Sequence, residues 1–267
     1  MAVDHEFGGQ HTDIKLSIVE KYLSAYSIAL RGKFSQLWYI DAFAGTGART
    51  VRHEAKPADL WDPEEPARIE QRHGSARIAI EVKPGFDLIV FVDSKPAHIA
   101  ALNDLAAKHP GRSIVVVKDD ANQAIRDLVR NQRWQSTRAV LLLDPYGMEV
   151  DWSTLEAVAK TKAIDVWFLF PISGLYRQAT RKITSIDEHK QAALTRILGS
   201  EDWKAELYSD SGQSEMFGDD PRVRLEDVSG LEKYVRRRLQ SIFPTVLKPL
   251  PLPVSRRPHF AVPLRVQ

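Results

Sequence analysis

Four acidic residues stand where apolar runs of this sequence end, and their side chains are the best placed to do chemistry. The runs LWYID, DLIVFVD, SIVVVKDD and AVLLLD end at Asp41, Asp93, Asp120 and Asp144. In an open parallel sheet, strand ends share one rim where ligands bind, so we expect the four carboxylates to face one ligand. For any one of them, capping of the next helix remains the alternative.

A glycine-rich turn, DAFAGTG, includes the first of these acids. Gly45 and Gly47 permit the tight bend and close ligand approach that a strand-to-helix turn needs. The dinucleotide pattern is missing, because Thr50 stands three residues after Gly47, and no phosphate-binding Gly-Lys-Ser/Thr follows. With Asp41 and Phe43, the turn suits a ligand that carries an ammonium group and hydroxyls, such as S-adenosylmethionine. An ordinary turn is the competing interpretation.

The next two strand ends complete a nucleoside site in this interpretation. Asp93, followed by Ser94, offers a carboxylate that can accept both ribose hydroxyls. Asp120 offers an acceptor to the adenine amino group, and Ala121 offers a small apolar contact to the ring. Each assignment is weak alone, and their order behind one glycine turn favours a methyl-donor site.

The stretch LLLDPYG, residues 141–147, is the predicted location of methyl transfer. The lone pair of an exocyclic amino nitrogen is delocalised into its base, so acceptors must hold its N–H groups while the nitrogen becomes tetrahedral. The Asp144 carboxylate and the Pro145 carbonyl can be those acceptors, and Tyr146 can stack on the base. A plain Asp-Pro-Tyr-Gly turn is the alternative.

Alternating strands and helices must hold these residues in place. Residues 12–31 have helical spacing after Thr12-Asp13, which we expect to cap the helix, and a further apolar run ends at Phe170. The alternation predicts an α/β fold: a doubly wound, Rossmann-like, mostly parallel sheet with helices on both faces. The helical patterns that follow the later acids cover residues 95–108, 121–133 and 152–162.

The predicted domains follow from spacing and composition. The core spans 1–175 with a loop-rich insertion at 49–85, because 52 residues separate Asp41 from Asp93 where 26 or 27 are regular. Within the insertion we expect a mobile loop over 52–73 and then a helix over SARIAIEV. Residues 176–242 indicate a helical extension. Residues 243–267, broken by prolines, indicate C-terminal strands that complete the core sheet as an antiparallel edge strand or hairpin, with the last strand incomplete.

Composition narrows the possible functions. The 267 residues include no cysteine, which excludes disulfides, thiolate metal sites and cysteine nucleophiles. The histidines lack metal-ligand spacing and no Gly-x-Ser-x-Gly occurs, so we predict neither a metal nor a serine hydrolase. The formal net charge of +2 is weak evidence about a polyanionic partner. Without a signal pattern or a long apolar run, the sequence predicts a cytoplasmic protein that contacts no membrane.

Basic and aromatic residues outside the core offer a further contact surface. A cluster in LEKYVRRRLQ can bind phosphates or form a solvated helix face, and both interpretations stay open. Trp61, in the charged insertion, can stack on a base or bind a partner. The basic residues concerned are Lys233, Arg236, Arg237, Arg238, Arg256 and Arg257.

Five stretches carry a family resemblance. They are HTDIKLSIVEKYLSAY (11–26), YIDAFAGTGAR (39–49), GSARIA (74–79), DDAN (119–122) and LLLDPYGM (141–148). Together they resemble the three-Cys-motif partner protein family, TcmP. The resemblance implies a class I S-adenosylmethionine-dependent methyltransferase-like fold and a partner that carries the three cysteines and is similar to radical S-adenosylmethionine proteins.

The resemblance also implies roles for single residues. The Asp-Pro-Tyr-Gly element resembles the D-P-F-G of tRNA guanine N2-methyltransferases and, more loosely, the D-P-P-Y of amino-methyltransferases that act on nucleic-acid bases. Tyr146 stands where D-P-P-Y has its second proline. His11 and Lys15 match the family's opening motif and would close over the cofactor pocket, although a helix cap with a solvated lysine is the alternative.

The predicted function is S-adenosylmethionine-dependent N-methylation of an exocyclic amino group in RNA or DNA. The alternative is an interaction module that binds S-adenosylmethionine or its product to serve the three-Cys-motif partner without methylating by itself.

Overall fold

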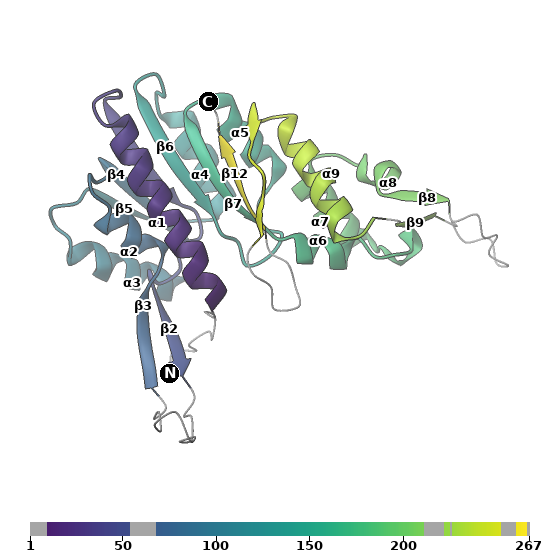
Figure 1. Ribbon diagram of the computed structural model, residues 1–267, viewed down its shortest axis with the longest axis horizontal. Helices are drawn as coiled ribbons and strands as arrows, with labels where there is room; N and C mark the ends of the chain where they lie inside the picture. Colours follow the sequence, from purple (N-terminus) through teal and green to yellow (C-terminus); the bar gives the residue numbers. More distant parts are fainter. Residues whose placement is uncertain (1–9, 54–67, 211–221, 225, 252–259, 266–267) are drawn as a thin grey trace, which may run out of the picture. The chain divides into compact units, whose positions relative to one another are not determined.

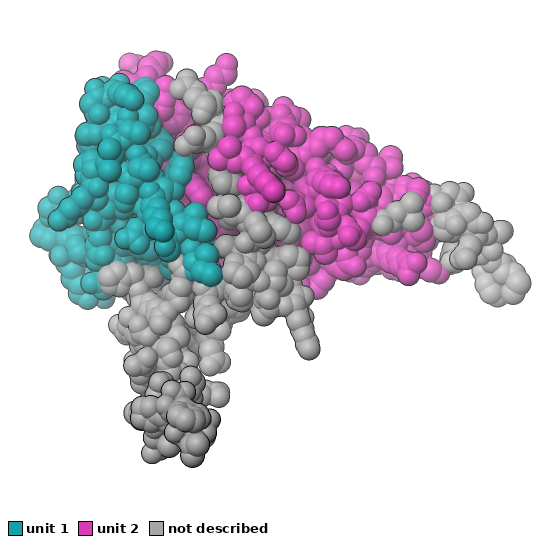
Figure 2. Space-filling model, in the orientation of Figure 1, with its two compact units in different colours: residues 1–120 teal, residues 121–267 magenta. Residues whose placement is uncertain are grey.

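The chain forms two compact units, residues 1–120 and residues 121–267, coloured separately in Figure 2. The computed structural model describes residues 10–53, 68–210, 222–224, 226–251 and 260–265. Trp61, Arg256 and Arg257 lie outside the described residues. The domain boundaries predicted at residues 175 and 242 stay predictions.

Outside the insertion, strands and helices of the first unit follow one another in the predicted order (Figure 1). Three strands pair in parallel, β1 with β4 and β4 with β5. β4 is buried from Ile89 to Asp93, whereas β5 is only partly buried. Continuous apolar runs are typical of strands covered on both faces, which explains why β1 and β4 are recognisable in the sequence. The elements are α1 (Gln10–Leu30), β1 (Gln36–Asp41), β2 (Ala48–His53), β3 (Arg68–His73), α2 (Ser75–Glu81), β4 (Leu88–Asp93), α3 (Pro96–Ala107) and β5 (Ile114–Lys118).

The first helix confirms the predicted helical segment, but its predicted cap is wrong. α1 begins at Gln10, so Thr12 and Asp13 lie in its first turn instead of preceding it. The buried face repeats every three or four residues, through Leu16, Val19, Leu23 and Tyr26.

The insertion differs from its prediction. The prediction of a loop over 52–73 is wrong at both ends. There, β2 and β3 pair antiparallel, from Ala48 opposite His73 to His53 opposite Arg68. Threonine, valine and isoleucine in these segments favour extended backbone, a signal hidden by the charged and proline-rich residues between them. Residues 54–67 lie outside the described residues. The helix predicted from SARIAIEV is confirmed as α2.

The second unit contains parallel and antiparallel strands. β6 and β7 pair in parallel, β12 pairs antiparallel with β7, and β10 and β11 pair antiparallel with β12. The predicted α/β class, mostly parallel with an antiparallel C-terminal hairpin and with helices around the strands, is confirmed. The elements up to α7 are α4 (Ala121–Asn131), β6 (Thr137–Leu143), α5 (Trp152–Thr161), β7 (Ile164–Phe170), α6 (Ile172–Gln178), the short 3-10 helix η1 (Ile183–Ser185) and α7 (Glu188–Leu198).

The predicted helical extension, 176–242, also contains two strands. β8 and β9 pair antiparallel between Tyr208 opposite Arg224 and Asp210 opposite Arg222. The pair contacts a distant segment of the chain: the Tyr208 hydroxyl donates to the Thr180 carbonyl at 2.6 Å, and the Arg224 N–H donates to the Arg181 carbonyl at 2.7 Å. The remaining elements are α8 (Trp203–Glu206), β8 (Tyr208–Asp210), β9 (Arg222–Arg224), α9 (Val228–Gln240), β10 (Thr245–Val246), β11 (Leu250–Pro251) and β12 (Phe260–Arg265).

The arginines of α9 contact the protein itself. Arg238 donates from Nε and Nη2 to the Leu198 carbonyl, at 3.1 and 2.8 Å, and lies over the Trp152 ring. Arg237 pairs with Glu206, and Arg236 donates to the Val246 carbonyl. Arg236 and Arg238 therefore help to pack the second unit, whereas Arg237 is an exposed side chain in an ion pair. Phosphate binding by this helix stays a prediction. Lys233 is exposed.

Candidate functional site

The glycine turn after β1 has the backbone conformation that only glycine adopts easily. Gly45 has φ +61° and Gly47 has φ +72°, both in the left-handed region. A Cβ added at Gly47 would lie 2.8 Å from Leu105 Cδ2, whereas one added at Gly45 would meet no atom within 4 Å. Gly47 therefore permits close packing on α3, and Gly45 leaves open space at the turn.

Hydrogen bonds fasten this turn to the end of β4. Ala44 N–H donates to the Val92 carbonyl at 3.1 Å, and Gly45 N–H donates to Asp93 Oδ2 at 3.1 Å. Phe43, between the buried Ala42 and Ala44, is half-buried. The first two strand ends are thus joined at the turn, as expected if they serve one ligand.

Asp41 lies inside the fold, with none of its surface exposed. Its Oδ2 accepts from Ser75 Oγ at 2.6 Å and from the Tyr39 hydroxyl at 3.2 Å, and its Oδ1 accepts from Phe43 N–H at 3.3 Å. The carboxylate thus connects β1, the turn and α2 in this structure. Ser75 was not predicted, and its position in the GSARIA stretch is the signal that could have revealed it.

Asp93 is 8% exposed and accepts three hydrogen bonds. Oδ2 accepts from Gly45 N–H at 3.1 Å and from His98 Nδ1 at 2.9 Å, and Oδ1 accepts from Lys95 N–H at 2.9 Å. An ionised carboxyl has about four lone-pair sites and cannot donate, so His98 is the donor. Both sites on Oδ2 are filled and one on Oδ1 remains. The predicted bond to both ribose hydroxyls needs a site on each oxygen, which requires His98 to turn away.

His98 was missed by the sequence reasoning. Its side chain is 13% exposed and lies in α3, five residues after Asp93. No local pattern marks it, because a single histidine on an apolar helix is usually part of the core. Ser94 is exposed between these two residues.

The third strand end lies at the boundary of the units. Asp119 N–H donates to the Asp93 carbonyl at 3.2 Å, which ties this end of β5 to that of β4. Asp120 is exposed and its N–H donates to Asp119 Oδ1 at 2.8 Å. Ala121 is buried and begins α4 in the second unit.

The Asp-Pro-Tyr-Gly stretch begins a loop in the second unit, residues 144–151, between β6 and α5. Asp144 and Pro145 are half-buried, whereas Tyr146 is 62% exposed. Such exposure suits stacking on a base or contact with a protein. Next to it in sequence, Met148 packs against α6, since a Cβ added at Gly174 would lie 3.5 Å from Met148 Cγ.

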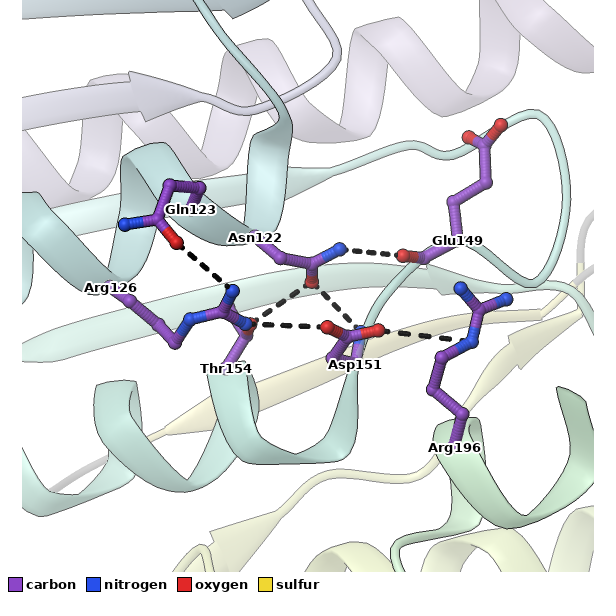
Figure 3. A network of polar contacts seen from close by, with 7 residues as sticks. All are labelled: Asn122, Gln123, Arg126, Glu149, Asp151, Thr154 and Arg196. Carbon is purple, nitrogen blue, oxygen red and sulfur yellow. Dashed lines mark hydrogen bonds and ion pairs between the residues drawn. The ribbon is translucent and has the colours of Figure 1, made fainter. Parts of the chain in front are cut away.

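A polar network surrounds the C-terminal end of the loop 144–151 (Figure 3). The Asn122 amide donates to the Glu149 carbonyl at 2.8 Å and accepts from Asp151 N–H at 2.9 Å and Thr154 Oγ1 at 3.0 Å. Asn122 is 7% exposed. It is the last residue of the DDAN stretch, and the sequence had given this asparagine no role. The network continues through Arg126 of α4 and Arg196 of α7, which both face Asp151.

The two residues predicted to close over the cofactor pocket lie in α1. His11 is in this helix, but its side chain lies outside the described part of the chain. Lys15 is half-buried, and the lid role of both residues stays a prediction.

Among the described residues, no group of three or more acidic or histidine side chains could hold a metal ion. No helix in the same ranges is long and apolar enough to cross a membrane.

No family model and no curated protein matches this chain. Similar solved structures include Trm5b from Pyrococcus abyssi, at 12% identity and TM-score 0.44, over 99% of this chain and 52% of that one. The magnesium protoporphyrin IX methyltransferase ChlM from Synechocystis PCC 6803 with bound SAH has 10% identity and TM-score 0.41, over 98% and 89%. Protein LPL1258 from Legionella pneumophila has 12% identity and TM-score 0.41, over 67% and 73%.

These likenesses include methyltransferases, and this chain spans about half the length of Trm5b. Identities and TM-scores of this size are too low to carry an argument about function. Membership of the TcmP family stays a prediction.

Proposed function

We propose that this chain binds S-adenosylmethionine at the glycine turn of its first unit and methylates an exocyclic amino nitrogen of a base in RNA or DNA. One observation carries the proposal. Gly45 is held in left-handed backbone by its bond to Asp93, with open space where a side chain would stand. A turn that is both fixed and open allows a nucleoside ligand to approach the backbone closely.

The cofactor residues take these roles in the proposal. The methionine part lies along the open side of Gly45, beside Phe43. Asp93 accepts one ribose hydroxyl at its remaining Oδ1 site, and Ser94 is available for the other. The exposed Asp120 accepts from the adenine amino group, and Ala121 contacts the ring.

Asp41 and Gly47 act indirectly in this proposal. Asp41 has no exposed surface, so it supports the turn through its bonds to Ser75 and Phe43 without touching the ligand. Gly47 lets the turn pack on α3. The predicted bond from Asp41 to the ammonium group is therefore replaced by a supporting role.

Bound S-adenosylmethionine supplies an electrophilic methyl group on its sulfonium. In the proposal, Asp144 and the Pro145 carbonyl accept the two N–H groups, which frees the nitrogen lone pair from the ring and directs it at the methyl carbon. Tyr146 stacks on the base. Transfer would break the bond between the methyl carbon and the sulfonium sulfur, whose electron pair would stay on sulfur as S-adenosylhomocysteine. Asp144 would take the proton that the nitrogen loses once its bond to carbon forms.

Replacing Asp144 by alanine tests the catalytic role. We expect D144A to bind S-adenosylmethionine with wild-type affinity by calorimetry and to lose transfer to RNA and DNA pools by about 100-fold or more. D127A, which removes a part-exposed acid of α4, is the control and should retain both properties. Equal transfer by D144A and D127A would remove Asp144 from the mechanism. Absence of calorimetric binding to the wild type would overturn the cofactor proposal.

The second candidate is an interaction module that binds S-adenosylmethionine to serve a three-Cys-motif partner. The 62% exposure of Tyr146 favours it, because an exposed ring beside the loop suits a protein surface as well as a base. The transfer screen, run with and without that partner, separates the candidates. Cofactor binding with no transfer in either arm supports the module.

A further inference from the structure

We infer that Asn122 is the positioning residue of the loop 144–151, and that Arg196 of α7 is its second anchor. The inference rests on the proposed function, in which residues of this loop hold the target nitrogen. Nothing in the sequence pattern assigns either residue to substrate binding.

The Asn122 side chain matches its surroundings only as an amide. Nδ2 donates to the Glu149 carbonyl, and Oδ1 accepts from Asp151 N–H and Thr154 Oγ1. Turning the amide over would place its NH2 group against the Asp151 N–H and its oxygen against the Glu149 carbonyl, so the hydrogen bonds fix its orientation. A carboxylate of the same shape keeps the acceptor and loses the donor. Because Asn122 is only 7% exposed, water cannot easily replace that donor.

Arg196 holds the same loop from a helix further along the chain. Its Nη2 donates to the Met148 carbonyl at 2.7 Å, and its Nε lies 3.8 Å from Asp151 Oδ1. The other oxygen of Asp151 lies 3.3 Å from Arg126 Nη1. Figure 3 shows Asp151 between the two guanidinium groups.

The loop backbone is therefore held at three nearby residues. The Met148 carbonyl binds Arg196, the Glu149 carbonyl binds Asn122, and the Asp151 N–H binds Asn122. The first of these lies only four residues after Asp144. Fixed geometry at one end of so short a segment limits the positions that the Asp144 carboxylate can take, and small displacements of such groups are costly in catalysis.

Substitution N122D removes the donor and keeps the acceptor, and hydrogen exchange of the amides at 147–151 is the readout. Near pH 8 we expect exchange about tenfold faster than in the wild type, because an oxygen would face the Glu149 carbonyl. Burial beside the Glu149 carbonyl should raise the pKa of the new carboxyl above its usual value of about 4. The ratio of the two rates should therefore return toward one near pH 5, since a protonated carboxyl is again a donor. If the substitution only disturbed the local structure, the exchange rate would stay high at the lower pH. N131D, the same change at the exposed last residue of α4, should leave exchange unchanged.

Transfer kinetics give a second readout. N122D should lower kcat about tenfold near pH 8 with the KM for S-adenosylmethionine unchanged, and lower pH should restore part of the loss. Wild-type exchange in N122D at both pH values would overturn the role of Asn122. If the wild type neither binds S-adenosylmethionine nor transfers methyl, the proposed function fails, while the exchange result still decides whether Asn122 positions the loop.

A second variant covers the case in which N122D does not fold. R196K keeps the charge but loses the fork that reaches both Met148 and Asp151, and the Arg196 side chain is 50% exposed, so the fold should tolerate it. We expect exchange at 147–151 to rise about threefold. Unchanged exchange in R196K would refute its anchoring role.

Discussion

The carboxylate of Asp93 organises the glycine turn, and replacing it by asparagine tests that role. Three donors converge on it, from Gly45, Lys95 and His98. An amide has one oxygen with two lone pairs, so D93N can keep two of these bonds at most, and its NH2 group must face the third donor. Hydrogen bonds to a charged group contribute about 1.5–3 kcal/mol each, so we expect the free energy of unfolding to fall by about 2–4 kcal/mol.

The same substitution should weaken cofactor binding. The bond from Gly45 N–H to Asp93 holds the turn in the conformation proposed to bind S-adenosylmethionine. If D93N leaves that conformation populated about a tenth of the time, the apparent Kd rises about tenfold. Urea denaturation measures the first effect, and calorimetry with S-adenosylmethionine measures the second.

A matched variant controls for the loss of charge. Asp119 is exposed at the next strand end, and its Oδ1 accepts a single bond, from Asp120 N–H at 2.8 Å. An asparagine oxygen can keep that bond, so D119N should change the free energy of unfolding by about 0.5 kcal/mol or less. If D93N unfolds and binds like D119N, Asp93 does not set the turn, and the cofactor geometry argued from it is refuted.

Paired substitutions give the remaining predictions. Tyr234 and Tyr208 are both 3% exposed, but the Tyr234 hydroxyl has no hydrogen-bond partner among the described residues, whereas Tyr208 donates to Thr180. In urea denaturation, Y234F should therefore gain about 1 kcal/mol and Y208F lose about 1 kcal/mol; equal effects would contradict this. Burial raises the pKa of Tyr234 to about 12, above its usual value of 10. Its contribution to stability is thus complete below pH 10 and is lost as the pH rises toward 12, and Y234F should lack this part of the alkaline decline. G45A should weaken S-adenosylmethionine binding more than G47A, because its Cβ fills the open side of the turn, and G47A should cost about 1–2 kcal/mol more stability through contact with α3. Equal losses of affinity and stability in the two glycine variants would refute the division of roles.

The strands could be predicted because burial leaves a pattern in the sequence. β4 and β6 are buried on both faces and therefore contain continuous apolar runs, which end in Asp93 as the last residue of β4 and in Asp144 directly after β6. The pairs β2–β3 and β8–β9 were not predicted, because neither is such a run. β2 and β3 are rich in charge, and the short pair β8–β9 also contacts the distant residues Thr180 and Arg181.

The positions of the candidate site residues were predictable, but their bonding was not. Asp41 and Asp93 stand at strand ends, as expected, yet the first is enclosed by Ser75 and the second is bound by His98. The donor to Asp93 at Gly45 is 48 residues away. A local pattern cannot show which lone pairs such distant donors will occupy.

By itself, the sequence determined the alternation of strands and helices and which acids end the strands, because both follow from the local periodicity of apolar residues. Only the tertiary structure decided that Asp41 has no exposed surface, that Asp93 keeps a single acceptor site, and that Asn122 holds the loop after Asp144. The physical reason is that exposure and hydrogen-bond occupancy depend on groups that folding brings together from distant parts of the chain.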